Sequence, residues 1–224
     1  MGVRHRRPPV TRIAVTFTAA ALVLAGCGAD ASDDSRELAS VVTIATEGCQ
    51  PVQVGTGAIV DDGIVLTAAH VVAGARTIEV TSGTASYDGV PVVVDTDLDV
   101  GVLRVVGLDA PALRLSPRPV RSVAAVALAG ENSLVKAPLR QVAWAVTTDI
   151  HREHEVTKLV LELDVLVEVG DSGAAVLDGV GDVVGVIVSV APELGISFAL
   201  HLDEFRQLLG SLPFEPTQRG SCSR

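Results

Sequence analysis

Short apolar runs, separated by glycine, proline or acidic residues, fill most of the chain after residue 40. The runs are rich in valine and poor in aromatic residues, and each is short for a helix. Runs of this kind, bounded by turn-forming residues, are typical of strands. We therefore predict an all-β protein with strands at residues 52–60, 64–68, 123–128, 142–148 and 183–190.

One segment near the end of the chain follows a different period. Its apolar residues recur at helical spacing: Phe205, Leu208, Leu209 and Leu212. We predict a helix over residues 202–212, which Gly210 and Pro213 end. His201 begins this helix and is expected to be structural, and nothing in the helix suggests a cofactor or partner site.

The first residues of the chain have the pattern of an export signal. Four arginines form a positive start: Arg4, Arg6, Arg7 and Arg12. An apolar stretch follows at residues 13–25, and LAGC (24–27) closes it. The stretch is shorter than the roughly 20 residues that span a bilayer, which disfavours an uncleaved anchor helix. Residues 1–26 resemble a bacterial lipoprotein signal peptide, which implies that Cys27 carries acyl chains such as palmitate and becomes the first mature residue.

The residues after this signal divide into a linker and a domain. Residues 28–37 are small, polar and acidic, so we predict a flexible tether at residues 27–38. Acyl chains on Cys27 would anchor the protein to the cell membrane on its extracytoplasmic side. The remaining residues, 39–224, suit one globular domain, and no second domain is expected.

The chain is acidic, with 27 Asp and Glu residues against 17 Lys and Arg residues and a formal charge of −10. Such a surface repels nucleic acids and anionic lipid headgroups, so neither is an expected partner. An acidic surface favours basic peptides, but solubility explains the charge equally well.

Three segments carry candidate chemistry, and they occur in the order LTAAH (66–70), DVGVL (99–103) and GDSG (170–173). Each adjoins a predicted strand. Together they predict a catalytic triad of His70, Asp99 and Ser172. In such a triad the Ser hydroxyl attacks an acyl carbon, the His moves the proton, and the buried Asp orients the His. A GDSG segment alone often marks only a turn, so the prediction depends on all three segments.

In this order the segments resemble those of the trypsin-like, chymotrypsin-fold serine proteases, particularly their bacterial secreted and envelope-anchored members. The resemblance runs from about residue 41 to about residue 212 and includes GTGAIV (55–60) and GVIVS (185–189). It implies two six-stranded antiparallel β-barrels with the active site between them, and a short C-terminal helix. It also implies a protein or peptide substrate, with no cofactor and no metal.

Three acidic residues compete for the role of triad acid: Asp95, Asp97 and Asp99. The family places its acid directly before a short apolar strand, with a small residue two positions on. Asp99 fits, because Gly101 stands at that position. Choosing Asp97 would bury the Asp99 carboxylate without a partner, at a cost of several kcal/mol. Asp95 and Asp97 are therefore interpreted as solvated loop acids.

The resemblance also assigns the residues that would bind the substrate. The backbone N–H groups of Gly170 and Ser172 would hold the oxyanion, and the missing Cβ at Gly170 suits that geometry. The pocket for the residue before the scissile bond would be formed by four residues: Leu166, Ser189, Val190 and Ala191. Because these are apolar or small, we expect a preference for small or aliphatic residues. Only Asp164 would reverse this expectation, if the alignment shifted by two residues.

Two departures from the family pattern support an alternative function. Ala174 and Ala175 stand where relatives have Gly and Pro, which adds methyl groups beside the substrate-binding strand. No apolar activation sequence precedes the domain to pair with Asp171, so we expect a protease made without zymogen cleavage. The alternative is a catalytically weak or inactive protease-fold binding module at the cell envelope. An esterase of another fold is disfavoured by the order of the triad.

The remaining cysteines and histidines allow two smaller predictions. With Cys27 lipidated, Cys49 and Cys222 remain as a pair in an exported protein and are expected to form a disulfide, with free buried thiols as the alternative. His151 and His154 can share a face, but no third ligand is expected nearby. A charged loop between strands is therefore expected there, with no metal.

Overall fold

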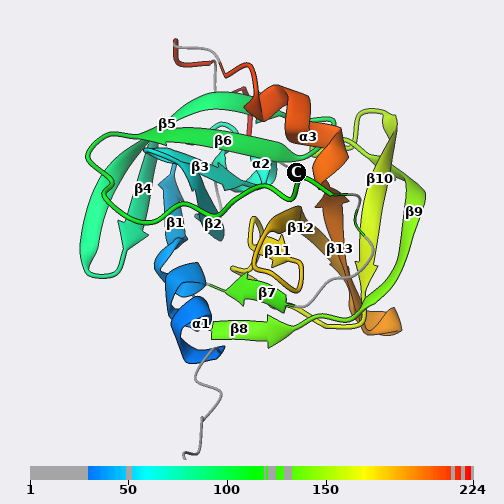
Figure 1. The fold of residues 1–224 in the computed structure, drawn as a ribbon. Helices are drawn as coiled ribbons and strands as arrows, with labels where there is room; N and C mark the ends of the chain where they lie inside the picture. The colour runs from blue at the N-terminus through cyan, green and yellow to red at the C-terminus, as the bar shows by residue number, and fades with distance from the viewer. Residues whose placement is uncertain are drawn as a thin grey trace, which may run out of the picture.

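The computed structural model describes residues 30–48, 52–118, 120, 125–128, 133–212, 215–217 and 220–222. The predicted signal peptide, Cys27 and Cys49 lie outside these residues. Among the helices that the structure describes, none is long and apolar enough to cross a membrane. Figure 1 shows two β structures packed side by side, with one helix at each end of the described chain.

The first half of the chain forms a closed barrel of six strands in the order β1-β2-β3-β6-β5-β4. The strands are β1 (Val41–Glu47), β2 (Gln53–Asp61), β3 (Ile64–Thr67), β4 (Thr77–Ser82), β5 (Ala85–Asp95) and β6 (Val100–Val105). Its interior is filled by branched aliphatic side chains, among them Ile44, Ile59 and Leu103. The first predicted barrel is therefore confirmed.

The second half forms a seven-stranded sheet in the order β8-β7-β11-β12-β13-β10-β9. The strands are β7 (Ala125–Leu128), β8 (Ser133–Lys136), β9 (Leu139–Thr148), β10 (Glu155–Leu163), β11 (Ala175–Leu177), β12 (Val183–Ala191) and β13 (Ile196–His201). Among the described residues this half is one antiparallel sheet of seven strands with β8 and β9 at its edges, where a six-stranded barrel was predicted. Only Ala137 and Pro138 join these strands, so the chain runs on around a corner instead of folding back into a hairpin.

All five strands predicted from apolar runs are present, as β2, β3, β7, β9 and β12. The terminal helix is also present, as α3 (Leu202–Leu209), and Gly210 is its C-cap. His201 is its N-cap, and its Nδ1 accepts a hydrogen bond from the Asp203 N–H at 3.1 Å. Burial lowers the pKa of His201, which favours the neutral ring that this acceptor role requires. The structural role predicted for His201 is confirmed.

The segment predicted to be a flexible tether differs from the expectation. Residues Asp30–Ala39 form a helix, α1, which lies beside β1, β7 and β8. Arg36 stands in its last turn, where a positive charge complements the helix dipole. Ser40 closes the turn by donating from Oγ to the Arg36 carbonyl and from N–H to the Glu37 carbonyl. These bonds close the C-terminal end of a helix that has few apolar residues of its own.

A shared apolar cluster joins the barrel to the sheet. It contains Leu66 and Val102 from the barrel, Val186 and Leu200 from the sheet, and the fully buried Phe205 of α3. β3 leads to His70, and β6 follows Asp99. The cluster therefore fixes both candidate residues relative to the second sheet.

Candidate active site

His70 and Asp99 form a hydrogen-bonded pair at the junction of the barrel and the sheet. His70 lies in the short helix α2 (Ala69–Val72), and Asp99 lies in the turn between β5 and β6. The His70 Nδ1 atom is 2.8 Å from Asp99 Oδ2 and 3.1 Å from Oδ1. The backbone N–H of His70 also donates to Asp99 Oδ1, at 2.9 Å. The carboxylate thus fixes both the ring and the backbone of His70, and leaves Nε2 as the ring atom opposite the pair.

The turn before β6 separates the three competing acids. Asp95 accepts hydrogen bonds on Oδ1 from the N–H groups of Asp97 and Leu98, which shapes the turn. Asp97 is exposed, whereas Asp99 is buried and contacts His70. The geometry of this turn agrees with the selection of Asp99, although Asp95 is half-buried rather than fully solvated.

The surroundings of His70 shift its proton affinity. Burial lowers the pKa of His70, but the hydrogen bond and the negative charge of Asp99 outweigh burial, and the net pKa is raised above its ordinary value of 6.5. The positive charge of Lys158 opposes this increase. The His70 ring is therefore suited to accept a proton, and Asp99 stabilises the imidazolium that forms.

The Ser172 loop is attached to the barrel through Thr56 of β2. The Thr56 N–H donates to the Ser172 carbonyl at 2.8 Å, and Thr56 Oγ1 donates to the Gly170 carbonyl at 2.9 Å. Thr67, three residues before His70, donates from Oγ1 to the Thr56 carbonyl at 2.7 Å. A short hydrogen-bonded path thus connects the Ser172 loop to the strand that leads to His70.

Two glycines give this loop its shape. Gly170 has a φ of +106° and Gly173 a φ of +90°, a region that residues with a Cβ rarely adopt. A Cβ at Gly173 would lie 2.2 Å from the Thr56 carbonyl oxygen. Within the described part of the chain, the N–H groups of Gly170 and Ser172 have no hydrogen-bond acceptor. Both donors can therefore serve a bound oxyanion.

The two departures from the family pattern have structural explanations. Asp171 is buried and accepts a hydrogen bond on Oδ2 from the Glu168 N–H at 2.7 Å, so its partner lies within its own loop. Ala174 and Ala175 are fully buried in two apolar clusters of the domain. Ala175 pairs with Val186 of β12, as expected for a residue beside the substrate-binding strand, and both methyl groups are packed in the core.

A cavity of about 730 Å³ opens beside the His70–Asp99 pair. The β9–β10 hairpin, with Lys158 and Arg152, forms its other wall together with Ser189 and Phe198. Of the predicted pocket residues, Ser189 lines this cavity. Leu166, Val190 and Ala191 are described by the structure but do not line it. The cavity volume is within the usual range for ligand sites.

The segment around Leu166, which was predicted to form a pocket wall, is held by Ser197 of β13. Ser197 Oγ donates to the Val165 carbonyl and accepts from the Val167 N–H. Asp164, which could have reversed the predicted preference, forms an ion pair with Arg140 at 2.6 Å. The Asp164 carboxylate is thus engaged at the surface.

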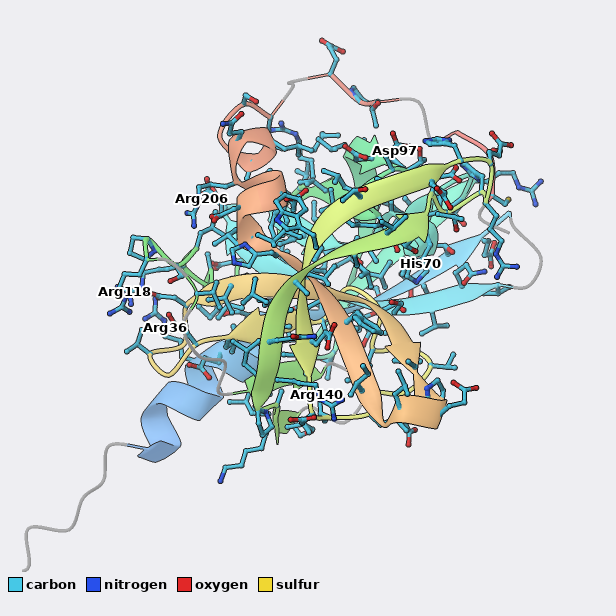
Figure 2. All side chains as sticks on the ribbon, turned by 90° about the vertical axis from the view of Figure 1, so that its right-hand side faces the viewer. Arg36, His70, Asp97, Arg118, Arg140 and Arg206 are labelled. Atoms are coloured by element: carbon cyan, nitrogen blue, oxygen red, sulfur yellow. The ribbon has the colours of Figure 1, made fainter. Side chains whose placement is uncertain are left out.

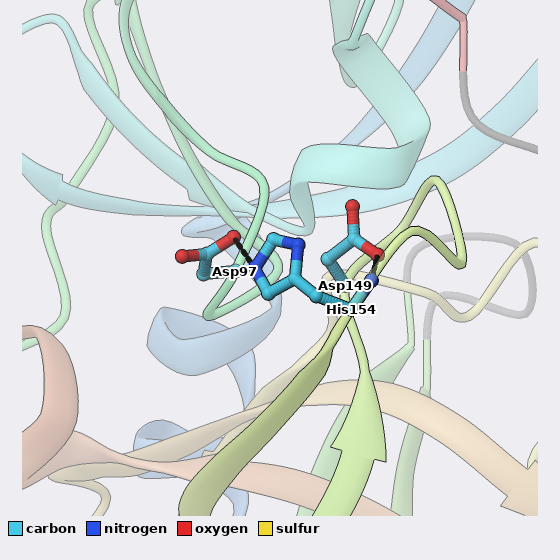
Figure 3. Close-up of side chains that lie close together, drawn as sticks. All are labelled: Asp97, Asp149 and His154. Atoms are coloured by element: carbon cyan, nitrogen blue, oxygen red, sulfur yellow. Dashed lines mark hydrogen bonds and ion pairs between the residues drawn. The ribbon is translucent and has the colours of Figure 1, made fainter.

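The loop containing His151 and His154 does join two strands, β9 and β10, as predicted. The expectation that no third donor lies near His154 was wrong in space, because Asp97 and Asp149 lie beside it (Figure 3). His154 Nε2 pairs with Asp97 Oδ1 at 3.1 Å, and the Asp149 carboxylate accepts three backbone N–H groups of the loop. These contacts explain the cluster as an ion pair and a loop cap, and we assign no metal ligand in it.

The chain matches a known protein family over more than half of its length. A family model described as a trypsin-like peptidase domain matches residues 55–186. The matched residues include His70, Asp99 and Ser172. The chain belongs to this family, and the fold class predicted from the sequence is confirmed.

Two known serine proteases are similar to most of this chain. Serine protease Rv3671c of Mycobacterium tuberculosis is 31% identical over 182 residues, which are 78% of this chain and 46% of that protein. Human serine protease HTRA4 is 32% identical over 169 residues, which are 71% of this chain and 35% of that protein. The chain spans less than half the length of these relatives.

Two solved structures of one of these relatives have the same fold as this chain. The Rv3671c protease in its active form has a TM-score of 0.77 at 29% identity, and covers 86% of this chain and 89% of its own. Its inactive form has a TM-score of 0.69 at 28% identity, and covers 81% of this chain and 92% of its own.

Sequence reasoning missed two residues that contact the site. Thr56 lies within GTGAIV, and the polar residue between two glycines in an otherwise apolar run was the available signal. Lys158 is one of two lysines in the chain and interrupts the apolar pattern of β10. A cation at a strand position that faces inward is unusual enough to indicate a specific partner.

Proposed function

We propose that this protein is a serine endopeptidase in which Ser172 is the nucleophile, His70 the general base and Asp99 the residue that orients His70. The observation that carries this proposal is the His70–Asp99 pair, joined through Thr67 and Thr56 to the Ser172 loop. Family membership supports the same chemistry.

The proposed reaction follows from these positions. His70 Nε2 takes the Ser172 proton as Oγ attacks the peptide carbonyl carbon, and the N–H groups of Gly170 and Ser172 bind the oxyanion. The protonated His70 then donates to the leaving amine. Water attacks the acyl-enzyme as His70 takes its proton, and His70 returns a proton to Ser172 Oγ as the acid product leaves. The hydrogen bond within the Asp171 loop supports an enzyme made without zymogen cleavage.

Cleavage of peptides by the purified protein tests this function. We expect wild type to cut peptides internally and Ser172→Ala to bind them without cutting. Binding by wild type without any cleavage would support the alternative, a protease-fold binding module. Mass spectrometry of the active protein tests the absence of zymogen processing, because a new N-terminus near Val41 would contradict it.

We also propose that the enzyme is anchored through Cys27 to the extracytoplasmic side of the cell membrane and acts on exported proteins or peptides. The lipoprotein-like signal at residues 1–26 supports this location. Incorporation of a palmitate analogue into wild type, with none in Cys27→Ala, is the expected result. Equal incorporation in both proteins would exclude this anchor.

For the substrate, we propose a small or aliphatic residue before the scissile bond. Support comes from the apolar or small character of Leu166 and Val190 and from the engagement of Asp164 by Arg140. A peptide-library profile dominated by Lys or Arg at this position would contradict the assignment.

The disulfide between Cys49 and Cys222 stays a prediction, because Cys49 lies outside the described residues. A close approach supports it: a Cβ at Gly74 would lie 2.4 Å from the Cys222 backbone nitrogen, and Arg76 donates to the Glu47 carbonyl. These contacts bring Cys222 toward the end of β1. Two reactive thiols in the unfolded, unreduced Cys27→Ala protein would exclude the pairing.

A further inference from the structure

We propose that Lys158 is a positioning residue for the triad: it holds the backbone that precedes Asp99 and presents its positive charge to the Asp99 carboxylate. This inference rests on the proposed function, in which Asp99 orients His70. It assigns a role in the reaction to a strand of the second sheet that supplies no member of the triad.

The contacts of Lys158 converge on the residues directly before Asp99. Its side chain is buried on β10, and Nζ donates to the Asp97 carbonyl at 3.0 Å and to the Leu98 carbonyl at 3.3 Å. A buried ammonium needs such acceptors, and these two belong to the turn that delivers Asp99. Lys158 also lines the cavity that contains His70 and Asp99.

The β9–β10 hairpin contacts the same turn at two further points. The Ile150 N–H donates to the Thr96 carbonyl at 3.1 Å, and His154 pairs with the Asp97 side chain. Figure 2 shows His70 and Asp97 on the same side of the molecule, beside this hairpin. The turn from the barrel is thus held at three successive residues by one hairpin of the sheet.

The turn needs this support because Asp99 has a φ of +63°. A left-handed conformation is costly for a residue with a Cβ and persists only where surrounding contacts determine it. Lys158 anchors the two preceding carbonyls, so it fixes the direction in which the chain enters this conformation. The Asp99 carboxylate then reaches both the N–H and the Nδ1 of His70.

The charge of Lys158 supplies a second effect. The charged and titratable groups that face Lys158 and His70 come from the β5–β6 turn and from the hairpin: Asp95, Asp97, Asp99, Asp149, Arg152 and His154. Lys158 is the buried cation among these carboxylates and offsets their mutual repulsion around Asp99. The same charge lowers the pKa of His70, which keeps more of the base neutral at a given pH.

Three substitutions separate the charge of Lys158 from its hydrogen bonds. Lys158→Met removes both, Lys158→Gln keeps a donor without charge, and Lys158→Arg keeps the charge. We expect kcat for peptide cleavage to fall about tenfold or more in Lys158→Met with KM nearly unchanged, because positioning acts on the transition state. Lys158→Arg should lose least. Lys136→Met is the matched control, because Lys136 is exposed on β8 and should leave kcat unchanged.

The His70 titration tests the charge directly and needs no activity. We would follow the His70 ring by NMR in the Ser172→Ala protein with and without Lys158→Met or Lys158→Gln, assigned with His70→Gln. We expect the pKa of His70 to rise in the protein with Lys158→Gln, which loses the charge but keeps a donor for the turn. The rise should be smaller with Lys158→Met, because a less firmly held Asp99 binds His70 less tightly. In the active enzyme, the acid limb of kcat/KM should move to higher pH, because the base must be neutral.

The outcomes distinguish this inference from the proposed function. If wild type cleaves peptides and the pKa of His70 and kcat are unchanged in a folded Lys158→Met protein, Lys158 has no positioning role. If wild type does not cleave peptides, the proposed function fails. The role of Lys158 then depends on the titration alone, and an unchanged pKa of His70 in the protein with Lys158→Gln would overturn it. A Lys158→Met protein that loses activity only in proportion to its loss of folded protein, with Lys158→Gln and Lys158→Arg alike, would indicate a merely structural lysine.

Discussion

Asp99 and Gly173 are the two residues whose backbone conformation most constrains the site. Asp99 adopts a left-handed conformation with a carboxylate that His70 binds twice, and Gly173 occupies a position where no Cβ fits. The constraint at Gly173 is close packing against Thr56 and Thr67, which are both buried. Together Asp99 and Gly173 fix the carboxylate beside His70 and the backbone of the Ser172 loop.

The raised pKa of His70 predicts a pH dependence. His70 must be neutral to accept the Ser172 proton, so activity is lost as the pH falls through the pKa of His70. Because the hydrogen bond and charge of Asp99 outweigh burial, the acid limb of kcat/KM should have its midpoint above 6.5. A pH–rate profile of peptide cleavage measures it, and a midpoint below this value would contradict the His70–Asp99 geometry.

A methyl group at position 173 should be severely damaging. Gly173→Ala would place Cβ against the Thr56 carbonyl oxygen and Thr67 Oγ1, and it would also strain a positive φ. We expect loss of activity with a free energy of unfolding lowered by about 2 kcal/mol or more. Gly179→Ala is the control, because nothing lies within 4 Å of the position that a Cβ would take there and its φ is not positive. Denaturant titration of both proteins makes the comparison.

The strand β2 holds the Ser172 loop through Thr56. Thr56→Val removes the Oγ1 donor but keeps the N–H bond to Ser172, so the Gly170 carbonyl loses its partner. We expect kcat to fall about tenfold or more as the oxyanion N–H groups lose alignment, with KM less affected. Thr81→Val on the exposed side of β4 should leave steady-state kinetics unchanged; equal kcat in both variants would show that Thr56 does not position the loop.

The sequence predicted elements better than contacts between them. Apolar runs located five strands, and helical spacing located α3, because local patterns follow directly from burial on one or two faces. The helix α1 was missed because its sequence has few apolar residues, and its contacts with β1, β7 and β8 are not encoded in a local pattern. The triad segments were recognisable from order, but the role of Lys158 depends on a contact across 61 residues of chain, which no local pattern encodes.

The barrel and the sheet are held together by a shared apolar cluster. Phe205 of α3 is fully buried in it beside residues of β3, β6, β12 and β13. Phe205→Ala should lower the free energy of unfolding by about 3–5 kcal/mol, and should reduce activity beyond the loss of folded protein, since the cluster aligns the two halves. Leu194→Ala, at an exposed side chain, should change stability by no more than about 0.5 kcal/mol. Thermal unfolding and peptide cleavage measured on both proteins test this coupling.

The arginines labelled Arg36, Arg118 and Arg206 lie away from His70 and Asp97, on the opposite side of the view in Figure 2. Arg118 pairs with Asp178 and Asp182, and Arg206 donates to the Ser116 carbonyl. These cations hold surface loops of the second half together. The site itself is lined by carboxylates, with Lys158 and Arg152 as the cations of its cavity wall among the described residues.

Labelling of the purified protein with a fluorophosphonate probe, which reacts with an activated serine, tests the catalytic triad. We predict rapid labelling of wild type, none of Ser172→Ala, and labelling slowed by up to about 10⁴-fold in Asp99→Asn, where His70 loses its orienting carboxylate. Absence of labelling in folded wild type, or labelling that survives in Ser172→Ala, would contradict the assignment of His70, Asp99 and Ser172 as a working triad.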